Sequence, residues 1–272
     1  MPSPALFVLR SGGLTLCWTL SLCCGVLLHS QARAQESSAS ASRQEHPLAP
    51  AIQLVQQSYQ VLQQVSDYEA TLIKQELVNG RMLNQRMQMR IREAPFSVYL
   101  LYEEPNQGRE ILFVQGQNNN QLIAHEGTGL SSLVGTIPLA IDSPQVMAEN
   151  RHVVTDLGMR RMLELVLNQW QVESRYGEID VRFYPNAKMG NADCEVIETI
   201  HPKPRKQFLY HMTRLFLEKN SRLPIRIENY GWPAQAGQQA QLLEEYTYVN
   251  VRTNTGMTAA DFDRRNPKYS FQ

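Results

Sequence analysis

Residues 86–126 limit the possible folds of this chain more than any other segment. It holds four runs of strand-forming residues, separated by short segments rich in proline, glycine and asparagine. In the first run Met87, Met89 and Ile91 alternate with polar side chains, which is the two-residue period of a strand with one dry and one wet face. The next two runs are dense in aromatic and β-branched residues. The stretch therefore predicts an antiparallel meander, and none of its residues indicates covalent chemistry.

Other segments add helices and further strands. Residues 47–66 repeat apolar side chains at the spacing of one helical face, and a second such face runs to about residue 176 from Thr155 or Asp156, either of which can cap a helix. Asn79-Gly80 lies between two strand-like runs and is a strong hairpin signal. After Gly177 only strand-like runs follow. About nine strands and two main helices, without β-α-β alternation, predict an antiparallel α+β fold.

Residues 127–150 interrupt this rhythm. The segment is apolar but punctuated by glycine, serine and proline, and most of it has no clear period. Long irregular loops in compact domains are usually functional or mobile. Two interpretations stay open: a flap that closes over a cavity, or irregular packing against the sheet.

The N-terminal 34 residues have the anatomy of an export signal. Arg10 precedes an apolar run from Leu14 to Leu28, and Ala32-Arg33-Ala34 fits a small-x-small cleavage site. An uncleaved membrane anchor is the alternative, but the run is shorter than the ~20 residues that a spanning helix needs. Its three cysteines lack the preceding small residue of a lipid-anchor signal. We expect a cleaved leader, and no lipid anchor or transmembrane span in the mature chain.

The expected organisation has three parts. Residues 1–34 are the signal peptide, residues 35–47 a flexible tether that begins rich in Ser, Ala and Gln, and residues 48–272 a single domain. Cleavage near Ala34 would place the protein in the periplasm or otherwise outside the cytoplasm.

Charge and motifs argue against several classes of function. The formal net charge is 0, so no excess of basic residues favours nucleic acid. The histidines show no metal-ligand spacing, and no Walker loop, dinucleotide fingerprint or G-x-S-x-G elbow occurs. We expect no catalytic residue, no metal and no cofactor. A hydrolase built on His125-Glu126 with Ser131 and Ser132 is a distant alternative.

Cys194 is the single cysteine outside the leader, so no internal disulfide is expected. Asp193 and Glu195 flank it, and adjacent acids disfavour a thiolate. We interpret Cys194 as a small core residue on a strand.

Three blocks carry a resemblance to a known family. They are APFSVYLLYEEPNQGREILFVQGQNNNQLIAHE at residues 94–126, NRHVVTDLG at 150–158 and EYTYVNVRTNTGMTAADFDRRNPKYSF at 245–271. They resemble a domain-of-unknown-function family of exported bacterial proteins, over roughly residues 52–271. That family in turn loosely resembles the LolA/LolB-type periplasmic lipoprotein carriers, through an early helix and a Pro-x-x-Gly-x-Glu-like turn at 105–110 between aromatic-rich strands. No residue aligns with the carriers' lid-gating arginine.

The resemblance implies a strongly curved antiparallel sheet, an incomplete LolA-like β-barrel. An N-terminal helix, a mid-chain helix and a loop would cover its concave face. Side chains expected to face an apolar cavity come from the strands, the irregular loop and the second helix. They are Met87, Met89, Ile91, Phe96, Val98, Leu100, Phe113, Leu133, Val134, Met159, Leu163 and Trp170.

Two functions follow from this picture. In the first, the protein binds a lipid, acyl chain or lipoprotein as a carrier or chaperone of the cell envelope. In the alternative, the half-barrel is filled by its own side chains and serves as a protein–protein interaction or sensor module of the envelope.

Leader cleavage can be tested directly. N-terminal sequencing of the protein from the envelope fraction should begin at Gln35, because the small-x-small site ends at Ala34. A membrane-extracted protein that still begins at Met1 would contradict the prediction.

Overall fold

Eleven antiparallel strands form a single sheet. The computed structural model describes residues 45–129, 135–235 and 237–271, so the predicted leader and most of the tether lie outside the described residues. The strands are β1 (Asp67–Val78), β2 (Arg81–Glu93), β3 (Phe96–Glu104), β4 (Glu110–Val114), β5 (Gln121–His125), β6 (Thr136–Ala140), β7 (Asp180–Met189), β8 (Ala192–Ile200), β9 (Met212–Glu218), β10 (Pro224–Tyr230) and β11 (Leu242–Thr253).

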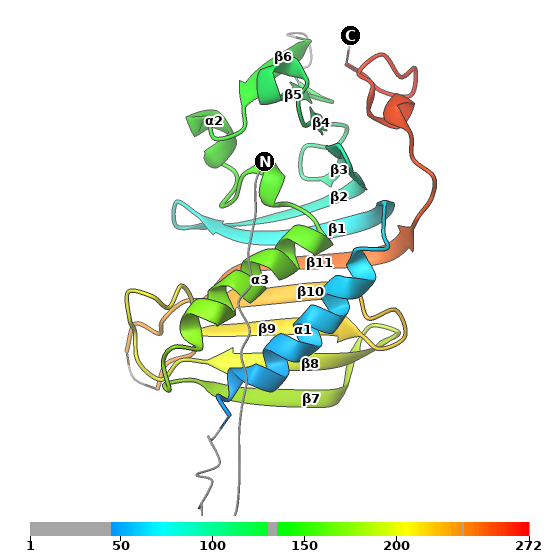
Figure 1. The fold of residues 1–272 in the computed structure, drawn as a ribbon. Coiled ribbons are helices and arrows are strands. Elements are labelled where there is room, and N and C mark those ends of the chain that lie inside the picture. The colour runs from blue at the N-terminus through cyan, green and yellow to red at the C-terminus, as the bar shows by residue number, and fades with distance from the viewer. Residues whose placement is uncertain (1–44, 130–134, 236, 272) are drawn as a thin grey trace, which may run out of the picture. The chain divides into compact units, whose positions relative to one another are not determined.

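The strand order shows why the sheet is an incomplete barrel. It runs β6-β5-β4-β3-β2-β1-β11-β10-β9-β8-β7, so the first and last thirds of the chain meet where β1 pairs with β11. The sheet is strongly curved, and β6 and β7 remain as its two edges in the described part of the chain (Figure 1). The predicted α+β class with an open, curved antiparallel sheet is confirmed.

Two long helices, α1 (Leu48–Leu62) and α3 (Met159–Glu173), pack together on one face of this sheet (Figure 1). Each buries a stripe at helical spacing, as predicted. The core between helices and sheet contains Val55 and Leu163 from the helices and Leu72, Met89 and Ile91 from the strands.

Cys194 also lies in this core and is fully buried, in agreement with its interpretation as a core residue. Burial raises the pKa of its thiol, and the nearby Glu218 carboxylate acts in the same direction.

The irregular segment before α3 contains more structure than its sequence indicates. Within residues 127–150, β6 extends the sheet beside β5, and the short helix α2 (Pro144–Met147) begins at a capping Ser143. The five residues of β6 are too few for a long alternating pattern, and Pro138 among them is unusual in a strand. An edge strand tolerates a proline because one of its sides needs no ladder hydrogen bond. Leu133 and Val134, expected to face the cavity, lie outside the described residues.

The predicted start of α3 was wrong. Residues Val154–Asp156 form a separate 3-10 turn, η3, and the helix begins at Met159 after Gly158. The buried Tyr68 hydroxyl of β1 accepts a hydrogen bond from the Met159 N–H at 2.9 Å, so a strand side chain serves as the cap. Gly158 has φ +109°, and a Cβ there would lie 2.9 Å from both Ile91 and the Tyr68 hydroxyl.

The outer face of β3, β4 and β5 is covered by the C-terminal tail, which includes the short 3-10 helix η4 (Ala259–Phe262). Tyr269 stacks on Tyr99 with ring centroids 4.1 Å apart, and Phe271 meets the same ring edge-on. This second cluster explains why β3 is apolar on both faces rather than alternating.

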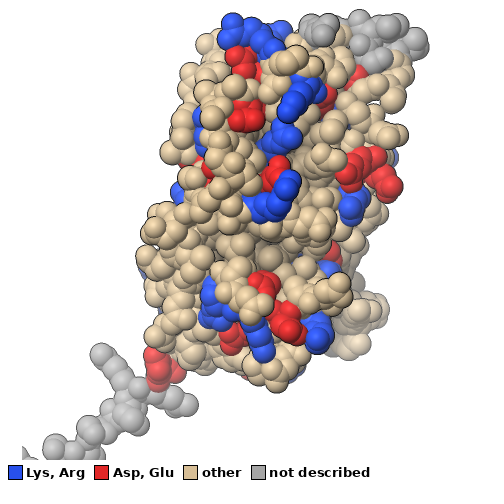
Figure 2. All heavy atoms as spheres, turned by 90° about the vertical axis from the view of Figure 1, so that its right-hand side faces the viewer, with Lys and Arg blue, Asp and Glu red and all other residues tan. Residues whose placement is uncertain are grey.

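Charges elsewhere on the surface are largely paired. Across β8, β9 and β10, for example, Arg214 contacts both Glu198 and Glu228. Figure 2 shows basic and acidic side chains interspersed over one face of the molecule. This distribution agrees with a formal net charge of 0.

The cap of α3 gives a stability test. Tyr68→Phe keeps the ring but removes the acceptor of a buried N–H, so the free energy of unfolding should fall by about 1–3 kcal/mol. Urea denaturation measures this change. Tyr176→Phe is the matched control, because the Tyr176 ring keeps its edge-on contact with Phe208, and its stability should change by less than about 0.5 kcal/mol. Equal stabilities for the two variants would contradict the capping role.

Candidate functional site

A cavity of about 460 Å³ lies on the concave face where α1 and α3 leave the sheet uncovered. Residues of β1 to β6 and of β9 to β11 form its floor, and α3 with the segment around α2 forms its walls. Most of its lining is apolar. The apolar side chains are Leu72, Met87, Leu100, Ile111, Leu122, Ala124 and Leu139 from the sheet, and Val146, Leu157, Met162, Val166 and Trp170 from the helical side.

Strand alternation places these side chains in the cavity. Leu100 in β3 pairs with Ile111 in β4, and Ile111 pairs with Ala124 in β5. Paired residues of neighbouring strands point to the same face. The same register continues to β6, where Leu122 of β5 faces Leu139. Together they make one continuous apolar surface.

The structure divides the twelve residues expected to line a cavity. Met87, Leu100 and Trp170 line it, whereas Phe96 lines a separate pocket of about 100 Å³. Six others are buried elsewhere, and Leu133 and Val134 lie outside the described residues, as noted. The six buried residues are Met89, Ile91, Val98, Phe113, Met159 and Leu163.

A physical reason explains this division. Alternation predicts which face of β2 a residue occupies, but not which part of that face a helix covers. Met89 and Ile91 lie in the core that α1 and α3 cover, and Ile91 also touches the start of α3 through Gly158. Met87, further along the strand, reaches the open part.

One side of the cavity is open to solvent. Leu165 and Val172 on the outer side of α3 line the cavity while remaining 36% and 37% exposed. Leu209, between β8 and β9, also lines it and is 62% exposed. This mouth has no signature in the sequence, because a leucine in a polar loop and two apolar residues outside the buried stripe of α3 form no distinctive pattern.

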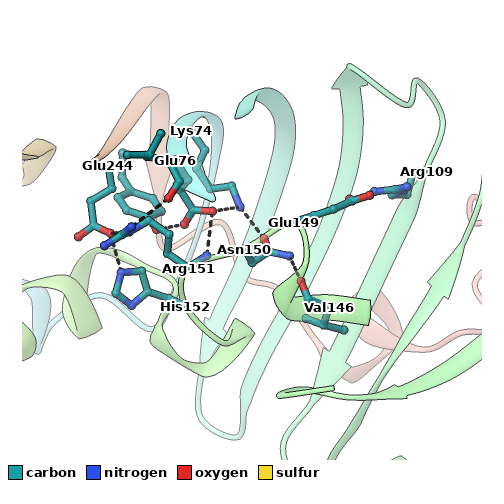
Figure 3. A network of polar contacts seen from close by, with 11 residues as sticks. Lys74, Glu76, Arg109, Val146, Glu149, Asn150, Arg151, His152 and Glu244 are labelled. Carbon is teal, nitrogen blue, oxygen red and sulfur yellow. Dashed lines mark hydrogen bonds and ion pairs between the residues drawn. The ribbon is translucent and has the colours of Figure 1, made fainter. Parts of the chain in front are cut away.

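A buried polar network borders the apolar part of the cavity (Figure 3). Lys74 and Glu76 project from β1 with their charged atoms 3.1 Å apart. The Tyr246 hydroxyl of β11 donates a hydrogen bond to Glu76. From the segment after α2, Asn150 accepts a hydrogen bond from the Lys74 ammonium at 2.5 Å, and the Arg151 backbone N–H donates to Glu76 at 3.2 Å.

Glu244 of β11 is the second centre of this network. It accepts from the Arg151 guanidinium at 2.9 Å, and its carboxylate lies 2.7 Å from the His152 ring. Tyr210 and Asn229 donate to its other oxygen at 2.6 and 2.8 Å. Burial by itself would raise the pKa of Glu244, but hydrogen bonds from His152, Tyr210 and Asn229 lower it to about 2.

Burial and the neighbouring carboxylates also shift the pKa values of the basic residues Lys74 and His152. Burial lowers the pKa of Lys74, although Glu76 opposes this effect. Burial would also lower the pKa of His152, but its hydrogen bond and charge contact with Glu244 outweigh burial and raise it. Each charged side chain of the network thus has an oppositely charged partner within it.

The network holds residues 149–152 against the sheet. In addition to the contacts of residues 150–152, Glu149 accepts from Arg109 at 2.6 Å, and Arg109 also pairs with Glu126. The sequence contains a sign of this contact, because Lys74 and Glu76 lie on the same face of β1 as Leu72. Charged residues on the dry face of a strand require buried partners.

No group of His, Cys, Asp and Glu suited to hold a metal ion occurs among the described residues. Within the same residues, no helix combines the length and apolar character needed to cross a bilayer.

Residues 65–271 match the model of a family described as "Protein of unknown function (DUF1571)". The chain belongs to this family. The family resemblance stated from the sequence is confirmed. A comparison with curated proteins gave no match.

Solved structures provide a looser likeness. Lipoprotein LppX from Mycobacterium tuberculosis is 12% identical, with 79% of this chain and 100% of that chain covered and a TM-score of 0.44. LprF from Mycobacterium bovis is 10% identical, with 78% and 97% covered and a TM-score of 0.43. A LolA superfamily protein from Nitrosomonas europaea is 10% identical, with 78% and 96% covered and a TM-score of 0.32.

The paired charges of the network predict a pH window for stability. The folded-state pKa of Glu244 is about 2, below its ordinary 4.5, so its contribution is complete above about pH 4.5 and is lost as the pH falls through about 2. The pKa of His152 is raised above 6.5, so its contribution is complete below that value and is lost as the pH rises through the folded-state pKa. The pair should therefore stabilise the fold most between about pH 4.5 and 6.5.

Urea denaturation across a pH series, for the wild type and His152→Gln, measures this window. The wild type should lose stability above pH 6.5 as His152 deprotonates, and His152→Gln should lose less over the same range. His125→Gln is the control, since His125 lies outside the network. Parallel pH profiles for the wild type and His152→Gln would show that the pair contributes no pH dependence.

Proposed function

We propose that this protein binds the acyl chain of a lipid or lipoprotein in the concave cavity, as a carrier or chaperone of the cell envelope. The observation that carries the proposal is an apolar cavity of about 460 Å³ with a mouth lined by exposed apolar side chains. Pockets of ~300–1,000 Å³ with mostly apolar lining are typical of small-molecule sites. Apolar surface in contact with water is unfavourable, so this lining gains when an acyl chain covers it.

The polar network supports the same function in a different way. Its charges are satisfied by one another, so a ligand without charge in its buried part meets no uncompensated group at the cavity wall. The network also fixes residues 149–152 at the border of the cavity, which keeps that wall in place when the space is empty. We infer binding without catalysis, in a protein exported by a leader at residues 1–34 and tethered by residues 35–47.

An envelope interaction or sensor module is the second candidate, and one observation favours it. The edge strand β7 exposes Phe183 and Tyr184, at 37% and 42%, beside an unpaired backbone edge in the described part of the sheet. Exposed edges are common sites for adding a partner's strand. This surface lies outside the cavity lining, so the two functions can be tested apart.

A titration with fatty acids of increasing length tests acyl binding. Each buried CH₂ contributes about 0.8 kcal/mol, so affinity should rise about fourfold per carbon until the cavity is full. Ala124→Trp places a large side chain in the cavity and should weaken binding of long chains strongly. Ala140→Trp adds the same side chain at an exposed position outside the lining and should bind like the wild type.

The stability of the tryptophan variants shows whether a substitution fills the cavity or overpacks the core. Ala124→Trp should unfold close to the wild-type temperature, because the cavity has room for the ring. Met89→Trp should lose about 1–3 kcal/mol, because Met89 is 1% exposed in the filled core. Affinity that is independent of chain length, or unaffected by Ala124→Trp, would refute the carrier function and favour the interaction module.

A further inference from the structure

The segment between β8 and β9, residues 201–211, combines features that acyl binding does not require. Leu209 is the most exposed of the large apolar side chains in the described residues, at 62%, and it lines the cavity mouth. Lys203, Arg205 and Lys206 precede it, and all three are exposed. Positive charge and exposed apolar surface thus occur within seven residues of one another at the entrance to the cavity.

This segment is held in one conformation by its buried residues. The Phe208 ring stacks on His201 with centroids 3.7 Å apart and meets Tyr176 edge-on. His201 lies 3.1 Å from the Glu178 carbonyl oxygen and 3.2 Å from the Glu173 carboxylate. Because the aromatic ring of Phe208 is fixed inside, the exposure of the neighbouring Leu209 is a property of the packed structure.

The charge of the segment is only partly compensated. Arg205 pairs with Glu178, whereas Lys203 and Lys206 form no ion pair within the described part of the chain. The neighbouring connection, residues 231–241, contains no acidic residue, and its Trp232 packs against His211 at 5.0 Å between ring centroids. The segment that carries the exposed leucine thus also presents two exposed lysines without an ion pair, and a half-buried tryptophan packs against its last residue, His211.

We propose that this face of the mouth, formed by residues 201–211 and Trp232, docks on the surface of an anionic phospholipid bilayer. Lysine and arginine near such a surface are attracted to the lipid headgroups. Tryptophan favours the headgroup level, and a protruding leucine gains by entering the acyl region. The inference rests on the proposed function: Leu209 also lines the cavity, so docking would place the opening against the lipids and let an acyl chain move between bilayer and cavity with little exposure to water.

Vesicle co-sedimentation of the purified protein tests the docking surface. The wild type should bind vesicles of phosphatidylcholine mixed with phosphatidylglycerol, bind pure phosphatidylcholine vesicles much less, and lose the difference as salt is added. The double variant Lys203→Gln/Lys206→Gln should bind the anionic vesicles about 25-fold more weakly, because each basic residue contributes about fivefold. Leu209→Ser should weaken binding about tenfold.

Matched controls remove the same groups elsewhere. Lys188→Gln/Lys219→Gln takes two charges from the opposite end of the same strands, and Val61→Ser removes a partly exposed apolar side chain from α1. Both should bind vesicles like the wild type, and thermal melts should show that all variants fold. Equal binding to neutral and anionic vesicles, or unchanged binding by Lys203→Gln/Lys206→Gln and Leu209→Ser, would overturn the proposal. An absence of vesicle binding at low salt would overturn it too and would assign the patch to a protein partner.

The fatty-acid titration is done without vesicles, so the two proposals fail separately. Loss of docking with intact acyl binding would refute only the membrane surface. Docking without any acyl binding would refute the proposed carrier function and leave a membrane-associated protein.

Discussion

The burial of one apolar sheet face is the constraint on which this structure depends. Eleven strands at a spacing of about 4.8 Å make a sheet about 50 Å wide before curvature. The two long helices have 15 residues each, about 22 Å of length, and they pack side by side. They can cover only part of the face. The sheet curves around the part that the helices leave uncovered, and this part, which includes residues of β1 to β6 and of β9 to β11, becomes the floor of the cavity.

The polar network is the second consequence of that geometry. Where the helices end, the sheet face is covered by irregular chain, whose backbone cannot satisfy itself as a helix does. Lys74, Glu76 and Glu244 provide strong donors and acceptors at that place, and residues 150–152 complete them. A single charge of this set without its partners would be expensive to bury, so its members stabilise the fold only as a group.

Periodicity predicted much of the fold and less of the site. The alternation of β2 and the apolar stripes of α1 and α3 depend on local spacing, so most of the sheet and the existence of both helices could be predicted from the sequence. About nine strands were expected and eleven form the sheet, because short strands such as β6 lack a long alternating pattern. The cap of α3 could not, because its acceptor is Tyr68, 91 residues earlier in the chain. The position of the cavity depends on which part of a strand a helix covers, which separates Met87 from Met89. No local sequence pattern marks the mouth residue Leu209, because its exposure depends on the packing of the neighbouring Phe208 ring on His201.

Native mass spectrometry of the protein purified from the envelope fraction tests the central claim most directly. If the concave cavity holds an acyl chain, the folded protein should carry an added mass that disappears on denaturation and is identified as a lipid. The added mass should be absent from Ala124→Trp and present in Ala140→Trp. A wild-type protein that shows only its own polypeptide mass, in the presence of abundant envelope lipid, would contradict the account.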